Sequence, residues 1–266
     1  MNTLKLASCM AENTEDFCLA IAGYLQWKLN VPTEYVTGIP WQEREAFFDR
    51  GEIQVLWLCG LPYVHKADLA ESSMELLAVP IPVGERYGSR PVYFSDVVVR
   101  RDSTCQSFLD LRGATWAYNE PRSHSGFNVV RAHLFELGEI DKFFAAAVEA
   151  GAHSKSLQMV LSGAVDCAAI DSTVLEWLGS QRNDLADEIR VIDTLGPSPI
   201  PPWVISRHVA ESQRRALRQL LGELHLDPAG RDILADGRLL RFTAADDNDY
   251  DPIRAMAHKA ERVSLV

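Results

Sequence analysis

The chain has 266 residues, of which 47% are hydrophobic and 24% charged, with a formal net charge of −11 and a pI near 5.1. This composition is typical of a globular protein and gives enough apolar material for one large domain or two lobes. The acidic balance excludes a general basic surface for nucleic acid, and no apolar run approaches the roughly 18 to 20 residues that insert across a membrane.

The N-terminus enters a strand at once and lacks an apolar signal segment of the usual length. We therefore expect either a cytoplasmic protein, or a periplasmic or lipid-anchored one whose export signal has been removed. The cysteines are odd in number, scattered, and without metal-ligand or redox spacing, which predicts reduced core residues and no bound metal or cofactor. They are Cys9, Cys18, Cys59, Cys105 and Cys167.

The first third of the chain predicts alternating strands and helices. The predicted strands are Leu4–Ser8, Thr33–Thr37, Ile53–Leu58 and Leu76–Val83, and the predicted helices are Glu12–Leu29, Trp41–Arg50 and His65–Glu71. Between them, Cys59–Val64 predicts a Gly-Pro turn at the carboxyl end of a buried strand, where open α/β sheets bind ligands. Tyr63 in this turn is therefore a candidate ligand residue, with simple core packing as the alternative.

The rest of the chain predicts a second set of βα units between two extended crossings. The long β-prone run Val92–Arg100 suits a chain leaving one lobe, and the proline-rich segment Gly196–Pro202 suits a chain returning to it. Further predicted strands are 113–118, 165–171, 188–193 and 203–206, further helices are 127–137, 154–162, 173–178, 211–224, 227–235 and 252–262, and Phe242–Asp251 is an acidic loop. We expect an α/β protein with one lobe formed by residues 1–95 and 196–266, the other by 96–195, and a hinge of two crossing segments.

A polar tetrapeptide, Ser123–Gly126, stands between a strand and an apolar-striped helix. At a helix start the free backbone N–H groups, the hydroxyls and the positive end of the dipole point to one place, which favours an anion. The alternative is that Ser123 or Ser125 only caps the helix. A positive charge on His124 is disfavoured by the dipole, so we expect a neutral imidazole.

Other polar residues also fall at predicted strand ends or helix starts. Tyr93 lies by the first crossing, His153 precedes a second helix that opens with Ser154 and Ser156, and Asp171 ends a buried strand. Two helix starts with hydroxyls and a histidine suit a tetrahedral oxyanion without any arginine. The alternatives are a buried structural role for His153 and a helix cap at Thr173 for Asp171.

Taken together, stretches along nearly the whole chain resemble the substrate-binding proteins of phosphonate, phosphate and phosphite ABC transporters. These stretches are Tyr93 with Ser95, Asp102-Ser103, Asp110–Gly113, Ser123–Gly126, Gly151–His153, Asp166–Asp171 and Asp249-Tyr250. The resemblance implies a two-lobe periplasmic-binding-protein fold that closes on a small anionic ligand, a phosphorus oxyanion, and delivers it to an ABC permease. It implies no catalytic residue, no metal and no cofactor.

Carried over position by position, the resemblance also implies a set of ligand-binding residues. The helix start supplies Ser123, His124, Ser125 and Gly126, the site is completed by His153, Tyr93 and Tyr63, and Asp171 faces the variable end of the ligand, such as an amine. Two positions depart from the family pattern. His124 replaces a small hydroxyl residue, and Cys59-Gly60 replaces a common Gly-Pro before the tyrosine.

Two other classes of function remain open at this point. The missing signal segment and the reduced cysteines suit a cytoplasmic enzyme on the same fold, with His124 or His153 as acid or base, although no catalytic triad, metal cluster or phosphate loop is visible. A ligand sensor that closes and docks on a partner is the third possibility.

Overall fold

The computed structural model describes residues 3–11 and 14–266, and these residues divide into two compact units. Unit 1 contains Met1–Val92 and Pro199–Tyr250, and unit 2 contains Tyr93–Ser198 and Asp251–Val266. The sequence expectation placed all of 196–266 in the first lobe. The difference arises at the C-terminal helix α10 (Asp251–Ala260), which packs against α4 (Val129–Glu136) of unit 2.

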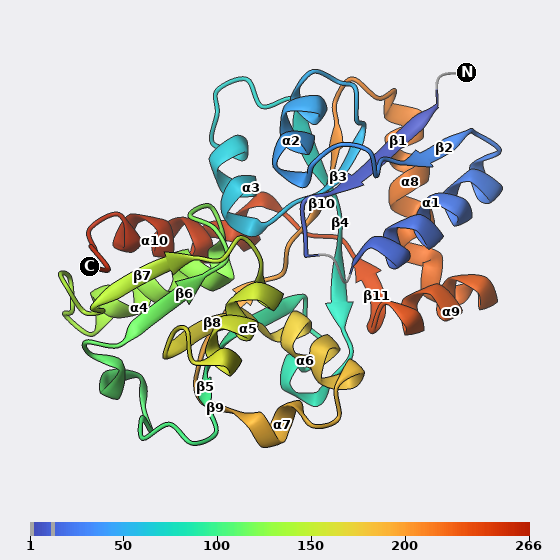
Figure 1. The fold of residues 1–266 in the computed structure, drawn as a ribbon. Helices are drawn as coiled ribbons and strands as arrows, with labels where there is room; N and C mark the ends of the chain where they lie inside the picture. The colour runs from blue at the N-terminus through green and yellow to red at the C-terminus, as the bar shows by residue number, and fades with distance from the viewer. Residues whose placement is uncertain (1–2, 12–13) are drawn as a thin grey trace. The chain divides into compact units, whose positions relative to one another are not determined.

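Unit 1 is built on a six-stranded mixed sheet with the order β11-β4-β10-β3-β1-β2 (Figure 1). Its strands are β1 (Leu4–Ser8), β2 (Thr33–Tyr35), β3 (Val55–Trp57), β4 (Met74–Pro82), β10 (Trp203–Ser206) and β11 (Leu239–Thr243). β1 pairs in parallel with β2 and β3, whereas β10 and β11 run antiparallel to their neighbours. β11 lies between the predicted helix 227–235 and the first residues of the predicted acidic loop 242–251, so the sequence did not predict this edge strand.

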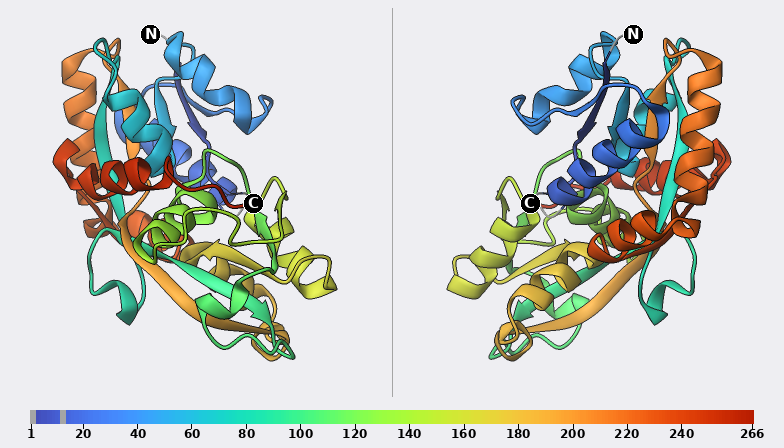
Figure 2. Two further views of the ribbon diagram at one scale, coloured as in Figure 1. Left: turned by 90° about the vertical axis from the view of Figure 1, so that its left-hand side faces the viewer. Right: turned by 90° about the vertical axis from the view of Figure 1, so that its right-hand side faces the viewer.

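Helices cover the sheet of unit 1 in two groups. The first group, α1 (Glu15–Leu29), α8 (Glu211–Glu223) and α9 (Pro228–Asp236), packs together, and the views of Figure 2 show α8 running along β4. The second group, α2 (Trp41–Asp49) and α3 (Gly60–Ala67), contacts β1, β3 and β4. Short 3₁₀ turns add Glu85–Tyr87, Leu224–Leu226 and Asp247–Tyr250. The core under the first group is rich in aromatic rings. The ring centroid of Phe17 lies 5.9 Å from that of Trp57 and 6.4 Å from that of Trp203.

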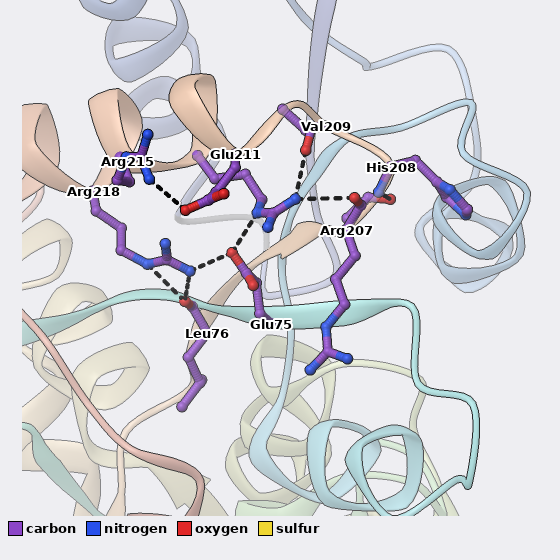
Figure 3. A network of polar contacts seen from close by, with 10 residues as sticks. Glu75, Leu76, Arg207, His208, Val209, Glu211, Arg215 and Arg218 are labelled. Atoms are coloured by element: carbon purple, nitrogen blue, oxygen red, sulfur yellow. Dashed lines mark hydrogen bonds and ion pairs between the residues drawn. The ribbon is translucent and has the colours of Figure 1, made fainter.

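An ion-pair network fastens α8 to β4 in unit 1 (Figure 3). Glu75 on β4 forms an ion pair with Arg214 Nε at 2.7 Å and accepts a hydrogen bond from Arg218 Nη2 at 2.5 Å. Arg218 also donates to the Leu76 carbonyl. Arg214 also donates to the carbonyls of Arg207 and Val209. Burial alone would raise the pKa of Glu75, but the two arginines lower it below its ordinary value of 4.5. The carboxylate therefore stabilises the folded state only while it is ionised.

A Glu75→Gln substitution is expected to lower the free energy of unfolding by about 1–2 kcal/mol at pH 7, because two partly buried guanidinium groups lose their charged partner. Since the folded pKa is depressed, this contribution is fully present above pH 4.5 and is lost as the pH falls below that value. Urea denaturation of both proteins from pH 3 to 7 measures it. Glu211→Gln is the control, since its pair with Arg215 is exposed and should contribute little. An equal effect of both substitutions would contradict the prediction.

Unit 2 contains a five-stranded sheet with the order β7-β6-β8-β5-β9 (Figure 1). Its strands are β5 (Val92–Arg100), β6 (Thr115–Tyr118), β7 (Ala146–Glu149), β8 (Cys167–Asp171) and β9 (Ile189–Pro199). β6 pairs in parallel with β7 and β8, and β5 runs antiparallel to β8. Strand β9 continues past Asp193 into the proline-rich segment, further than predicted.

In unit 2, helix α4 packs against α10. Three further helices are α5 (His153–Ser162), α6 (Ser172–Gln181) and α7 (Leu185–Glu188). Helix α5 contacts strands β6 and β8, α6 contacts α5, and α7 contacts α6. The turn Phe108–Leu111 adds a 3₁₀ element, and α7 was not predicted from the sequence. A core that includes Trp116, Phe143 and Phe144 lies beneath α4. Within residues 3–11 and 14–266, no helix is long and apolar enough to cross a bilayer.

Candidate functional site

The tetrapeptide Ser123–Gly126 forms the start of a helix, as predicted. Ser123 has extended backbone angles, and its hydroxyl oxygen accepts a hydrogen bond of 3.1 Å from the Gly126 N–H. The first turn, His124–Asn128, is a π-helical turn that continues into α4. The helix therefore begins at His124 rather than at Phe127. Such wide turns are frequent at functional sites, and the first-turn amides have no intrahelical acceptor.

Gly126 is held in close contact with the end of strand β6. A Cβ atom at this position would lie 2.1 Å from Asn119 Oδ1, 3.0 Å from Asn119 Cγ and 3.2 Å from His153 Cε1. A larger residue at this position would require Asn119 or the helix start to move. The Asn119 Oδ1 atom is itself buried and has no hydrogen-bond partner among the described residues. Asn119 is thus a polar component of the site that was not among the residues predicted from the sequence.

The second predicted helix start meets the first. His153 is the first residue of α5, one position earlier than predicted, and its Nε2 atom lies 3.0 Å from Ser125 Oγ. Burial lowers the pKa of His153 to about 4, against a smaller opposite effect of the Ala169 carbonyl. The imidazole is therefore neutral at pH 7, and it can exchange its hydrogen bond to Ser125 for one to a bound anion.

The imidazole of His124 is fully buried. Its Nε2 atom lies 2.9 Å from Ser198 Oγ, and its Nδ1 atom lies 3.1 Å from Asn128 Nδ2. Burial lowers the pKa of His124 to about 3, in line with the expected neutral ring. The Tyr93 ring lies 6.4 Å away, centroid to centroid, so these two predicted residues are also brought together. Asn128 and Ser198 were not selected from the sequence.

Asp171 has the structural role that the sequence left open as an alternative. Its Oδ1 atom accepts from the N–H of Thr173 at 2.8 Å and from the hydroxyl of Thr173 at 2.7 Å, so it caps α6. The carboxyl group is buried, and this burial raises its pKa to about 6, with a further small contribution from the charge of Asp96. At pH 7 a buried negative charge therefore stands at the end of β8, next to the π-helical turn that contacts this strand.

Tyr63 belongs to unit 1, and the predicted turn around it is wrong. Helix α3 already begins at Gly60, because Pro62 falls in its first turn, where a missing N–H costs nothing. The Tyr63 hydroxyl donates to Asp247 Oδ1 at 2.7 Å, and its ring lies 4.5 Å from that of Tyr250. Tyr250 in turn donates to the Ile200 carbonyl at 2.8 Å.

Unit 2 therefore gathers hydroxyls, a neutral imidazole and the amides of a helix start around Ser125. These groups donate hydrogen bonds without carrying a positive charge, which suits an anion that is held by direct short-range contacts. The buried Asp171 carboxylate opposes an anion but attracts a cation. No cluster of His, Cys, Asp or Glu suited to a metal ion occurs among the residues that the structure describes.

A family model for periplasmic substrate-binding proteins of phosphonate ABC transporters matches residues 10–250. The match spans both units and includes every predicted ligand residue.

Solved structures of similar fold cover nearly the whole chain. PhnD1 from Prochlorococcus marinus, solved with methylphosphonate, is 19% identical with a TM-score of 0.85, covering 98% of this chain and 99% of its own. A binding protein of a phosphonate ABC transporter from Pseudomonas aeruginosa is 18% identical with a TM-score of 0.84, covering 97% and 86%. A Xanthomonas citri protein bound to ATP is 16% identical with a TM-score of 0.76, covering 98% of both chains. These similarities confirm the predicted two-lobe α/β fold.

Proposed function

Because the chain belongs to the family of periplasmic substrate-binding proteins of phosphonate ABC transporters, we propose that it binds a phosphonate group at the helix start Ser123–Gly126. Membership of this family confirms the resemblance seen in the sequence, and with it a role in substrate binding for transport. The family is a transport component and not an enzyme, so the enzyme alternative is not retained.

The observation that carries the proposed site is the meeting of two helix starts at Ser125 and His153, 3.0 Å apart. A phosphonate oxygen placed there would accept from the Ser125 hydroxyl, from the His153 imidazole and from backbone amides of the π-helical turn His124–Asn128. Ser123 would add its hydroxyl hydrogen, since its oxygen already accepts from Gly126. His124 would contribute its backbone N–H, because both nitrogens of its ring are occupied by other side chains.

The other members of the proposed site act on the rest of the ligand. Tyr93 would line the phosphonate pocket beside His124, and Asp171 would face a cationic substituent such as an amine. Tyr63 would come from unit 1 when the units close on the ligand, as proteins of this fold do through a hinge. For Tyr63 to donate to the ligand, its hydroxyl must leave Asp247.

We further propose that the chain is exported and delivers its ligand to an ABC permease. The family is periplasmic, which supports this location. The two imidazoles stay neutral near pH 7, because burial lowers the pKa of His124 to about 3 and that of His153 to about 4, so neither gains a charge near neutrality.

A Ser125→Ala substitution is expected to weaken phosphonate binding by about 1–3 kcal/mol, because one charge-assisted hydrogen bond is lost and the His153 imidazole loses its partner. Calorimetric titration with methylphosphonate, 2-aminoethylphosphonate, phosphate and phosphite measures the loss and ranks the ligands. Ser180→Ala is the matched control, because Ser180 is exposed near the end of α6 and its hydroxyl donates to the Trp177 carbonyl, away from the proposed site. Absence of binding to all four ligands by the unchanged chain would overturn the proposed function.

A further inference from the structure

His124 occupies a position that links the helix start to both ends of the chain segment forming most of unit 2. The chain enters this unit at Tyr93 and leaves it after Ser198. The imidazole lies against the Tyr93 ring and contacts Ser198 Oγ, while its own backbone belongs to the first turn of the helix start. One side chain therefore contacts the entering segment, the leaving segment and the turn proposed to bind phosphonate.

The hydrogen bonds of the ring define its tautomer. The amide nitrogen of Asn128 can only donate, so Nδ1 of His124 accepts and carries no proton. The proton then resides on Nε2, which donates to Ser198 Oγ at 2.9 Å. Both ring nitrogens are thus used within unit 2, and neither is left to contact a ligand. The ring is rigid and fully buried, so movement at either end is transmitted through it.

The two segments that His124 contacts also lie next to each other. β5 and β9 are neighbours in the sheet of unit 2. A Cβ atom at Gly196, whose φ of +119° favours glycine, would lie 3.3 Å from the Tyr93 carbonyl oxygen and 3.1 Å from the Ser198 N–H nitrogen. The backbone is therefore packed tightly where the chain enters and leaves this unit.

We infer that His124 is a positioning residue that couples the phosphonate-binding turn to the segments through which the chain enters and leaves unit 2. This inference rests on the proposed phosphonate site. Occupation of the turn fixes its backbone, and the imidazole fixes Tyr93 and Ser198 in the arrangement that belongs to the bound state. A small hydroxyl residue at this position would be too short to contact both segments.

The decisive variant is Ser198→Ala, which removes the acceptor of the Nε2 proton without changing any residue of the proposed ligand site. We expect methylphosphonate affinity to fall by about tenfold, the equivalent of one lost hydrogen bond. In this variant we also expect the ligand no longer to protect the amides of residues 92–95, Gly196, Ser198 and Ile200 against hydrogen exchange. Thr194→Val is the matched control: it removes a hydrogen bond to Asp96 from the same strand, but one that does not involve His124.

Three outcomes decide the inference. Loss of affinity and of amide protection in Ser198→Ala, with both retained in Thr194→Val, supports it. Equal behaviour of the two variants overturns the coupling alone, whereas failure of the unchanged chain to bind methylphosphonate or 2-aminoethylphosphonate overturns the proposed function as well. The ring ¹⁵N signals of His124 in the bound protein give an independent check: a protonated Nε2 and an unprotonated Nδ1 support the assignment, and a coupling to the ligand ³¹P nucleus would overturn it.

Discussion

A Gly126→Ala substitution is expected to weaken phosphonate binding by between about tenfold and a hundredfold. The added Cβ would lie 2.1 Å from Asn119 Oδ1 and 3.2 Å from His153 Cε1, both closer than normal carbon contacts. Relief requires either Asn119 or the helix start to move, and overpacking of this kind costs about 1–3 kcal/mol. Since the same turn carries the amides that the ligand would use, the displacement acts directly on binding.

A second substitution separates this steric cause from general loss of the fold. The double variant Asn119→Ala, Gly126→Ala removes the closest contact and should recover much of the lost affinity, while Asn119→Ala alone reports the contribution of the amide. Titration calorimetry measures affinity in all three, and urea denaturation measures their stability. Binding by the Gly126→Ala variant equal to that of the unchanged chain would contradict the placement of the site at this turn.

Local sequence chemistry was enough to identify the parts of this site that one helix start defines. A serine with extended backbone before an apolar-striped helix specifies its own cap, and the structure shows that cap between Ser123 and Gly126. The β-prone run at Val92 and the buried strand ending at Asp171 were likewise found, because strand propensity and termination are short-range properties. The overall α/β organisation follows from the order of these elements.

Contacts between distant positions could not be predicted in the same way. Ser198 lies 74 residues from His124 and has no property that distinguishes it from other serines, so its hydrogen bond to Nε2 depends entirely on the fold. The sequence also predicted a turn at Tyr63, because Pro is read as a helix breaker although the first helical turn accepts it. The C-terminal helix α10 was assigned to the first lobe, since amphipathicity reveals an apolar face but not its partner.

Burial of a charged group in unit 2 lowers the free energy of unfolding, and the proposed function gives that group a use. Asp171 is the clearest case, since its pKa of about 6 lies well above the ordinary 3.8 and the first cause is burial. The folded state binds a proton here that the unfolded state releases, so stability decreases as the pH rises from about 4 to 6 and stays lower above that range. The difference of about two pKa units corresponds to about 3 kcal/mol. An amide at this position would carry no charge and would avoid this cost.

An Asp171→Asn substitution is therefore expected to raise the free energy of unfolding at pH 7 by about 2–3 kcal/mol and to leave it unchanged at pH 4. The cap on α6 persists, because an asparagine Oδ1 accepts from the Thr173 N–H as an aspartate does. Asp227→Asn is the matched control. That residue caps α9 but is only partly buried and pairs with Lys28, which lowers its pKa, so the substitution should destabilise the protein at pH 7.

Affinity for a phosphonate that carries an amine should fall in the Asp171→Asn variant, although the stability of the variant rises. Loss of the carboxylate removes the partner of a cationic substituent, so affinity for 2-aminoethylphosphonate should fall by at least about tenfold, the equivalent of one charge-assisted hydrogen bond. Affinity for methylphosphonate, which has no cation, should stay equal or rise, because a nearby negative charge no longer opposes the phosphonate. Calorimetry with both ligands at pH 7 measures the affinities, and urea denaturation at pH 4 and 7 measures the stability of the same variant. A stability gain with unchanged preference between the two ligands would show that Asp171 only caps its helix.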